Sequence, residues 1–184
     1  MTDHQQLSDK EKLQLIKDSV KSYPDFPVPG VVFRDLFSVL ENPPIFALLK
    51  ELLIKQVKQI QPPIESVVGL DARGFLFGPL ISLDLQVPFV PIRKKGKLAG
   101  KVRSYKYSLE YGEDTMEIKE DAIKPGQRVL VVDDLLATGG TLNAACNLVS
   151  QVGGIVVKCL VVIELVDLKG RDKLPAEVLP LTQF

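Results

Sequence analysis

The sequence predicts an α/β fold in which a doubly wound, mostly parallel sheet is flanked by helices. From residue 65 onward, short runs of β-branched residues alternate with segments of helical spacing, which is typical of successive β-α units. Several of these runs are almost continuously apolar, as expected for strands buried on both faces of a parallel sheet. At 184 residues the chain has the length of about one domain.

Two helices precede this alternating region. Ser8 and Glu11 form a capping box, and apolar residues follow them at helical spacing. Three prolines and a glycine within 23–30 are expected to exclude a regular element there. The second helix begins at Asn42-Pro43, carries one apolar stripe and ends before the proline pair 62–63.

The elements of the sheet follow in order, with one interruption. Strands are predicted at 65–69, 87–92, 128–132 and 155–163, and helices at 74–85 and 140–152. Residues 94–121 break the alternation, because they are charged and punctuated by glycines. We expect a two-stranded excursion there, at 105–111 and 115–119. An interruption of this length in a compact domain indicates a functional loop or lid.

Composition argues against several functional classes. Lys plus Arg and Asp plus Glu both total 23, so the chain has no overall field to hold nucleic acid or an anionic membrane. The single histidine, His4, lies in a polar leader, which argues against Ser-His-Asp and His-metal chemistry. Cys146 and Cys159 stand in apolar surroundings and are expected to be buried. Neither a signal peptide nor an apolar run of about 20 residues is visible, so we expect a cytoplasmic protein.

Segment 129–141 carries the strongest chemical signal. An apolar run leads into Asp133 and Asp134, and then into a loop with two glycines and two threonines that opens a helix. Glycines, hydroxyls and the N–H groups of a helix N-terminus suit a phosphate. Two carboxylates repel a phosphate but accept hydrogen bonds from ribose hydroxyls, with magnesium reducing the repulsion. The segment therefore predicts a ribose 5-phosphate site; the alternative is a helix-capping turn with solvated acids.

Two further segments follow predicted strands. Arg73 lies at the start of a helix, a suitable position for a second anion, although Asp71 and Arg73 could instead form a structural pair. The run 93–97 contains four basic residues and by itself could be a solvated face. Because three anion-type segments on one sheet edge suit a polyphosphate, we favour a binding role for both.

Together these segments resemble the type I phosphoribosyltransferase family. Segment 129–141 resembles the family's signature for phosphoribosyl pyrophosphate. Residues 26–35 and 107–112 resemble the base-binding hood and the lid of its purine-specific members. The resemblance extends from Tyr23 to Lys173. It implies the family's fold as a single domain over residues 1–184, with a hood near residues 24–37 and a lid near residues 94–121.

The resemblance implies a transfer of the 5-phosphoribosyl group from phosphoribosyl pyrophosphate to N9 of adenine, giving AMP and pyrophosphate. Magnesium is expected as the cofactor, held mainly through the substrate and water rather than by protein side chains. In family members that use 6-oxopurines an aspartate stands at the position of Ala137, so alanine here favours adenine. A homodimer is expected, with Arg93 acting across its interface.

Two alternatives differ in function. One is a phosphoribosyltransferase for another purine base, such as xanthine. The other is a non-catalytic regulator that senses phosphoribosyl pyrophosphate and binds DNA. Such a regulator would be expected to carry a helix-turn-helix segment and a strongly basic face, and the sequence shows neither.

The resemblance also assigns roles residue by residue. Catalytic roles fall to Arg73, Glu110 and Tyr111, with Glu110 handling the purine proton. The 5′-phosphate is assigned to Ala137, Thr138, Gly139, Gly140 and Thr141, and the ribose hydroxyls to Asp133 and Asp134. Pyrophosphate is assigned to Asp71, Ala72, Arg73, Arg93, Lys94 and Lys97, and the base to Val32, Phe33 and Arg34. The Asp71–Ala72 peptide bond is expected to be cis.

Overall fold

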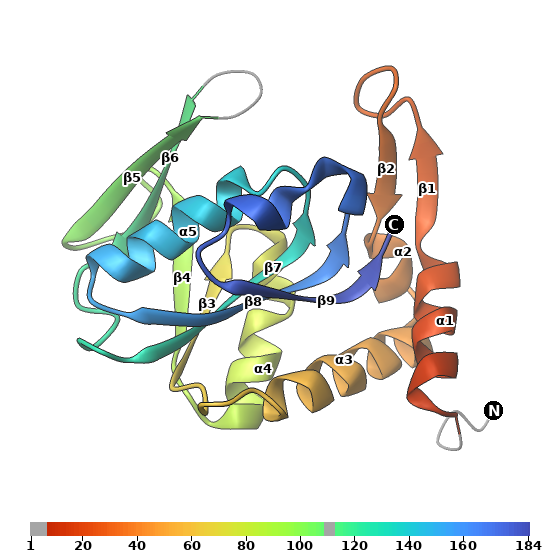
Figure 1. Cartoon of the computed structure of the whole chain (residues 1–184), viewed down its shortest axis with the longest axis horizontal. Coiled ribbons are helices and arrows are strands. Elements are labelled where there is room, and N and C mark those ends of the chain that lie inside the picture. The colour runs from red at the N-terminus through yellow and green to blue at the C-terminus, as the bar shows by residue number, and fades with distance from the viewer. Residues whose placement is uncertain (1–6, 109–112) are drawn as a thin grey trace. The chain divides into compact units, whose positions relative to one another are not determined.

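The computed structural model describes residues 7–108 and 113–184 (Figure 1). The chain divides into two compact units, Met1–Gln56 and Val57–Phe184. No helix within these described ranges is long and apolar enough to cross a membrane.

The N-terminal unit combines helices with a pair of strands. Its elements are α1 (Asp9–Ser19), β1 (Lys21–Pro24), β2 (Val32–Asp35), α2 (Phe37–Leu40) and most of α3 (Pro43–Lys58). The capping box is confirmed, because Ser8 Oγ accepts the N–H of Glu11 while the Glu11 carboxylate accepts the N–H of Ser8. An ion pair of 2.6 Å between Lys12 and Glu51 joins α1 to α3.

The expectation that 23–30 excludes a regular element is wrong at its first two residues. Strand β1 runs through Tyr23 and Pro24 and pairs antiparallel with β2, so that Tyr23 lies opposite Phe33. In a two-stranded ribbon every strand is an edge strand, and an edge strand tolerates proline. The rest of the segment turns between the strands, with Gly30 at a φ of +86°.

The C-terminal unit is built on a seven-stranded sheet of order β5-β6-β4-β3-β7-β8-β9. The strands are β3 (Ser66–Leu70), β4 (Phe89–Lys94), β5 (Val102–Ser108), β6 (Glu113–Lys119), β7 (Arg128–Leu136), β8 (Ile155–Glu164) and β9 (Glu177–Gln183). Strands β4, β3, β7, β8 and β9 run parallel, whereas β6 is antiparallel to β4 and β5 to β6. The predicted mostly parallel sheet is confirmed, and the predicted excursion forms the hairpin β5–β6.

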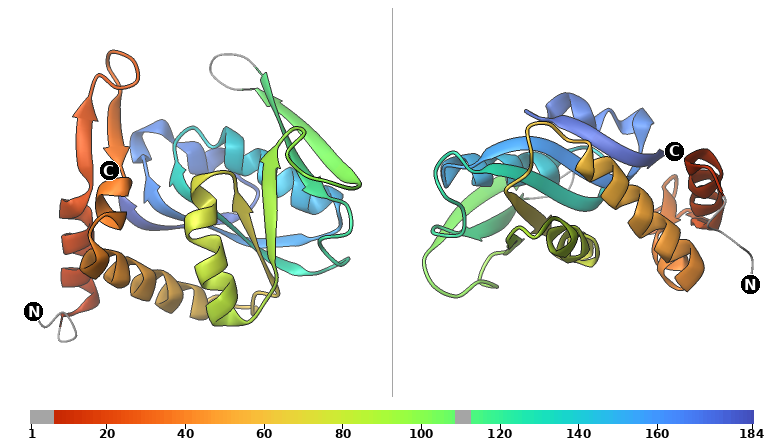
Figure 2. Two further views of the ribbon diagram at one scale, coloured as in Figure 1. Left: turned by 180° about the vertical axis from the view of Figure 1, so that it is seen from behind. Right: turned by 90° about the horizontal axis from the view of Figure 1, so that it is seen from below.

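Helices on both faces connect the parallel strands. The 3-10 helix η2 (Arg73–Leu76) and α4 (Gly78–Leu85) join β3 to β4, and α5 (Gly140–Gln151) joins β7 to β8. Helices α4 and α5 cover opposite faces of the sheet (Figures 1 and 2). The helix predicted at 74–85 thus begins as a 3-10 turn. Two further 3-10 helices, η3 (Val166–Leu168) and η4 (Gly170–Lys173), precede β9.

Two strands differ from the expectation. Strand β7 continues to Leu136, so Asp133 and Asp134 are strand residues, and Leu136 lies opposite Glu164 of β8. Strand β9 was not predicted, because Pro180 stands in its middle. It lies at the edge of the sheet, where proline is tolerated.

The core of this unit lies between α5 and the sheet. Ala144, Ala145, Leu148 and Val149 of α5 are fully buried in the same cluster as side chains of β3, β7 and β8. Cys146 and Cys159 are buried free thiols, as predicted, with their sulfurs 3.5 Å apart.

The strand order reverses between β3 and β7. Strand β3 connects outward to β4, whereas β7 connects outward to β8 on the other side. In an open α/β sheet, ligands bind beyond the carboxyl ends of the strands at such a switch point.

Candidate active site

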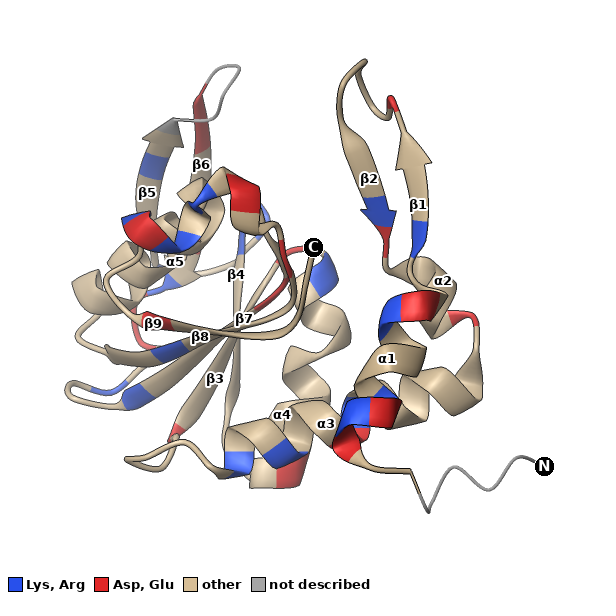
Figure 3. Cartoon of the chain, turned by 45° about the vertical axis from the view of Figure 1, so that its right-hand side comes forward, with Lys and Arg blue, Asp and Glu red and all other residues tan. Residues whose placement is uncertain are grey.

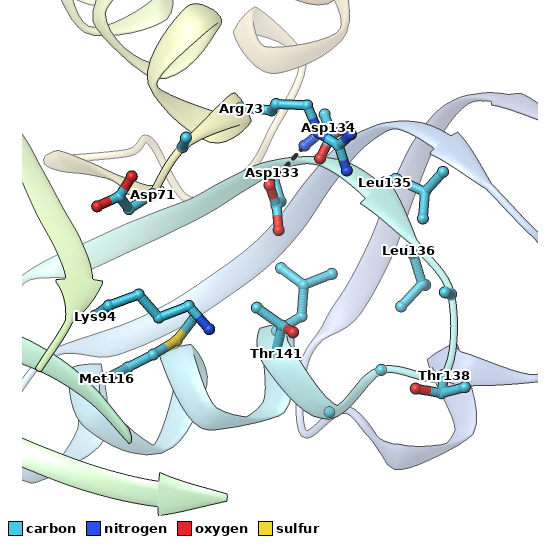
Figure 4. A pocket seen from close by; sticks show the side chains of 15 residues that line it. Asp71, Arg73, Lys94, Met116, Asp133, Asp134, Leu135, Leu136, Thr138 and Thr141 are labelled. Carbon is cyan, nitrogen blue, oxygen red and sulfur yellow. Dashed lines mark hydrogen bonds and ion pairs between the residues drawn. The ribbon is translucent and has the colours of Figure 1, made fainter. Parts of the chain in front are cut away.

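A cavity of about 270 Å³ lies at this switch point, beyond the carboxyl ends of β3 and β7 (Figure 4). It brings together most of the predicted site residues. Those that line it are Asp71, Ala72, Arg73, Lys94, Asp133, Asp134, Ala137, Thr138, Gly139, Gly140 and Thr141.

The loop 137–141, called here the phosphate loop, connects β7 to α5. Gly139 is the N-cap of α5 with a φ of +84°, a left-handed conformation that glycine adopts without a steric penalty. Because the N-cap is a glycine, no capping side chain hydrogen-bonds to this end of the helix within the described residues. The first turn of a twelve-residue helix therefore offers free N–H groups and partial positive charge, which suit a phosphate.

The backbone of Gly170 packs directly against the phosphate loop. A Cβ atom on Gly170 would lie 2.1 Å from the carbonyl oxygen of Ala137, and a Cβ on Gly139 would lie 2.3 Å from that of Gly170. Only glycine, which has no Cβ atom, fits at positions 139 and 170. Gly170 is not among the predicted site residues, because no local motif connects it to a loop much earlier in the chain.

Asp133 and Asp134 are neighbours on β7 but have different surroundings. The side chain of Asp134 is 7% exposed, and its Oδ2 lies 2.7 Å from Nε of Arg73. Asp133 points away from Arg73, toward the side of the cavity that holds Thr141 and Lys94 (Figure 4). Burial, and then the charge of Asp134, raise the pKa of the Asp133 carboxyl well above its usual range. An ionised Asp133 is therefore unfavourable in the ligand-free protein.

The loop after β3 is held by two ion pairs. The Asp71–Ala72 peptide bond is cis, as predicted. The alternative of a structural pair between Asp71 and Arg73 is wrong: Asp71 pairs with Arg93 at 2.7 Å, and Arg73 pairs with Asp134. The side chain of Arg73 stays 38% exposed, so a carboxylate orients its guanidinium while a ligand can still reach it.

The basic run 93–97 divides into two parts. Lys94 lines the cavity, where its ammonium donates to the Tyr107 hydroxyl at 3.2 Å and pairs with Asp114. Burial alone would lower the pKa of Lys94, but the hydrogen bonds to Asp114 and Tyr107 outweigh it and raise that pKa. The hydrogen bond from Lys94 in turn lowers the pKa of Asp114.

Arg93 and Lys97 do not line the cavity. The guanidinium of Arg93 binds Asp71, lies 5.9 Å from the centre of the Phe75 ring and donates to the carbonyl of Lys97 at 3.3 Å. Lys97 is exposed on the turn that follows β4.

The residues predicted to bind the base belong to the other unit. Val32, Phe33 and Arg34 lie on β2, where Phe33 packs edge-on against Phe26 with ring centres 5.1 Å apart. Arg34 donates to Ser22 Oγ at 2.6 Å. Glu110 and Tyr111 lie outside the described residues.

Part of the cavity wall is apolar and was not predicted from the sequence. Met116, Leu135, Leu136 and Leu142 line the cavity. Met116 comes from β6, and only the pairing of β6 with β4 brings it near Lys94.

The acids could face a cation carried by a ligand. Within residues 7–108 and 113–184, no group of three or more His, Cys, Asp or Glu side chains is arranged to hold a metal ion. The unfavourable charge of Asp133 beside Asp134 nonetheless fits a cation that arrives with an anionic ligand. Magnesium, which retains water and takes one or two carboxylates with substrate phosphates, suits such a site.

Comparisons with known proteins agree with this geometry. The family model for the phosphoribosyl transferase domain matches residues 37–179. The adenine phosphoribosyltransferase of Drosophila pseudoobscura pseudoobscura is 51% identical over 179 residues, which cover 97% of this chain and 99% of that protein. The Homo sapiens adenine phosphoribosyltransferase is 49% identical over 180 residues, with the same coverage of 97% and 99%.

A solved structure extends the agreement to three dimensions. The Saccharomyces cerevisiae adenine phosphoribosyltransferase, complexed with D-2,5-dideoxy-2,5-imino-altritol 1,6-bisphosphate and adenine, has a TM-score of 0.87 at 41% identity. The alignment covers 94% of this chain and 99% of the yeast chain. On the matched domain and these relatives, the chain belongs to the adenine phosphoribosyltransferases of the phosphoribosyl transferase domain family.

Proposed function

We propose that the protein transfers the 5-phosphoribosyl group of phosphoribosyl pyrophosphate to N9 of adenine, forming AMP and pyrophosphate. One observation carries the proposal: a phosphate loop at a helix N-terminus, two adjacent carboxylates and Arg73 line the same cavity. The yeast relative, which binds adenine and a bisphosphate, supports the same pair of substrates.

The phosphate loop and the two acids bind the ribose 5-phosphate half of the substrate. Backbone N–H groups of residues 137–141, with the hydroxyls of Thr138 and Thr141, take the 5′-phosphate. Asp133 and Asp134 accept hydrogen bonds from the ribose hydroxyls. Arg73 occupies one oxygen of Asp134, so the other oxygen is left for the sugar.

Arg73 and the loop Asp71-Ala72 bind the pyrophosphate half. The guanidinium of Arg73 has further N–H donors beyond the one that Asp134 holds, and these can meet a phosphate oxygen. Lys94 lines the same cavity and contributes a second positive charge. Lys97 and Arg93 add positive charge near the pyrophosphate site. We assign Arg93 to the site of the neighbouring subunit in a homodimer.

The chemical step depends on positioning and on charge. The bond from C1′ to pyrophosphate breaks early, which leaves an oxocarbenium-like centre and a departing anion. Holding the ribose by its phosphate and hydroxyls aligns C1′ with N9 of adenine. Asp133 and Asp134 are the residues that would face a magnesium ion arriving with the substrate, and such an ion would supply positive charge against the leaving pyrophosphate.

The base is bound by the hood, which we assign to residues 24–37 with Val32, Phe33 and Arg34 as its contacts. Adenine must lose an imidazole proton as N9 bonds to C1′, and Ala137 cannot accept it. We assign that proton to Glu110, assisted by Tyr111, on a lid at residues 94–121. In this proposal residues 1–184 act as one phosphoribosyltransferase domain, in a homodimer located in the cytoplasm.

The test is a screen of free bases. The purified protein is incubated with phosphoribosyl pyrophosphate, magnesium and one of adenine, hypoxanthine, guanine or xanthine, and pyrophosphate release is followed. We expect release with adenine alone, with AMP as the co-product, and loss of release in Arg73→Ala. Release with xanthine instead would reassign the base. Binding of phosphoribosyl pyrophosphate without turnover of any base would indicate a sensor rather than an enzyme.

A further inference from the structure

Glu164 is a buried carboxylate that the proposed reaction does not use. It is the last residue of β8, and its side chain is 2% exposed. Arg171 Nε donates to one of its oxygens at 2.6 Å, while Arg171 Nη2 and Gln183 Nε2 donate to the other. The hydrogen bond from Arg171 lowers the pKa of Glu164, so the pair is ionised and bidentate.

Arg171 belongs to the segment between β8 and β9, where basic and acidic residues lie side by side (Figure 3). Backbone hydrogen bonds hold the start of this segment: Leu165 N–H donates to Leu136 O at 2.9 Å, and Val166 N–H to Phe184 O at 3.0 Å. Farther along, the bidentate pair joins η4 back to the sheet. Because two N–H groups of one planar guanidinium bind the two oxygens of Glu164, the pair restricts the orientation of the Arg171 side chain as well as its distance from β8.

Gly170 transmits that restriction to the cavity. It directly precedes Arg171, and its backbone meets Ala137 and Gly139 so closely that neither glycine has room for a Cβ atom. The phosphate loop therefore rests against a backbone segment whose position is set by an ion pair outside the cavity.

We infer that Glu164 and Arg171 are positioning residues for the phosphate loop. Their ion pair holds Gly170 against Ala137 and Gly139, and this contact keeps the loop in the conformation that binds the 5′-phosphate. The inference rests on the proposed function, since it takes the loop to be the 5′-phosphate site. Small displacements at such sites are costly, about a hundredfold for 1 Å in catalysis.

The test compares ribose 5-phosphate, assigned to the phosphate loop, with magnesium pyrophosphate, assigned to the loop after β3. Dissociation constants for ribose 5-phosphate and for magnesium pyrophosphate are measured by calorimetry on the full chain. Wild type is compared with Glu164→Gln, Arg171→Met, Arg171→Lys and Gly170→Ala. Arg73→Ala is included to assign pyrophosphate binding to the loop after β3. Glu177→Gln is the matched control, because Glu177 pairs with Lys158 across the same strands β8 and β9 but away from the phosphate loop.

We expect Glu164→Gln and Arg171→Met to weaken ribose 5-phosphate binding by about tenfold or more, with pyrophosphate binding changed less than about twofold. Arg171→Lys should recover part of the loss, since it restores the charge but not the two-donor geometry. Glu177→Gln should leave both constants unchanged.

The outcomes separate the inference from the proposed function. If wild type does not bind ribose 5-phosphate, both are overturned. If wild type binds it and the variants bind it equally well, or lose both ligands equally, the positioning role is overturned. Should Arg171→Met fail to fold, Glu164→Gln and Arg171→Lys decide: selective loss of ribose 5-phosphate supports the inference, and unchanged binding overturns it.

Discussion

At the scale of single residues, the site contains a carboxylate whose ionisation opposes folding. Burial and the neighbouring charge of Asp134 raise the pKa of Asp133 in the folded protein. Between the unfolded pKa of about 3.9 and the higher folded pKa, the folded state holds the proton more tightly. Stability therefore falls as pH rises through this window, and above it the ionised Asp133 destabilises the ligand-free protein by a constant amount.

Asp133→Asn is predicted to stabilise the free protein at neutral pH while weakening phosphoribosyl pyrophosphate binding. We expect a gain of about 0.5–2 kcal/mol, typical of relieving an unfavourable functional position, and no gain near pH 4. Thermal unfolding across this pH range measures it. Asp134→Asn is the comparison: it removes the charge that opposes ionisation of Asp133 but also leaves Arg73 without its carboxylate partner, so it should stabilise the protein less. A stability gain that does not depend on pH would contradict the electrostatic explanation.

In the proposed function, Asp114 would compete with pyrophosphate for Lys94, with which it forms an ion pair. Asp114→Asn should free the ammonium and remove a negative charge from the edge of the cavity. Pyrophosphate affinity is predicted to rise by about two- to fivefold, the size expected for a partly exposed pair. Calorimetric titration provides the comparison, with Glu113→Gln, whose partner Lys106 is exposed, as the matched variant. Equal or weaker binding by Asp114→Asn would show that Lys94 does not meet the ligand.

At the scale of elements, features encoded within a short segment could be predicted, and features that depend on pairing could not. The run 129–141 by itself indicated a strand, two acids, a phosphate loop and a helix. Nothing local indicated that β7 would extend to Leu136, because that extension depends on Leu135 and Leu136 pairing with β8. Proline obscured β9 and the end of β1, since both are edge strands whose tolerance of proline depends on their neighbours.

The same limit applies to the site. The motifs identified Arg73, Asp134 and Lys94 as site residues, but their partners come from other elements. Arg73 pairs with Asp134 rather than Asp71, Lys94 pairs with Asp114, and Gly170 supports the phosphate loop. Each of these contacts joins segments that only the sheet order brings together. The assignments of Glu110, Tyr111 and the base-binding residues stay predictions.

The hairpin β5–β6 is the element on which the proposed proton transfer depends, because Glu110 stands in the chain between its two strands. Glu110→Leu is predicted to lower the single-turnover rate of AMP formation by about 10²–10⁴-fold, the usual range for general acid–base catalysis. Affinity for phosphoribosyl pyrophosphate should barely change. Rapid-quench measurement of AMP gives the rate, and a near-normal rate in the variant would leave the proton to water.

At the scale of the whole molecule, the proposed homodimer makes a prediction about shared sites. If Arg93 completes the neighbour's site, a mixed dimer of Arg93→Ala and Arg73→Ala subunits contains one site with both arginines. Random mixing makes half of the dimers mixed, so two inactive variants should recover about a quarter of wild-type activity. The measurement is AMP formation after co-refolding or co-expression. No recovery would mean that Arg93 acts within its own subunit, where it binds Asp71.

The ion pair between Arg73 and Asp134 has a thermodynamic consequence for the two products. In the proposed function, one member of the pair faces pyrophosphate and the other faces the ribose of AMP, so each ligand alters the electrostatic environment of the other. Linkage requires this influence to be mutual: whatever factor pyrophosphate applies to the affinity for AMP, AMP applies to the affinity for pyrophosphate. In the proposed function, a single arginine–aspartate contact thus makes the affinity for each product depend on the presence of the other.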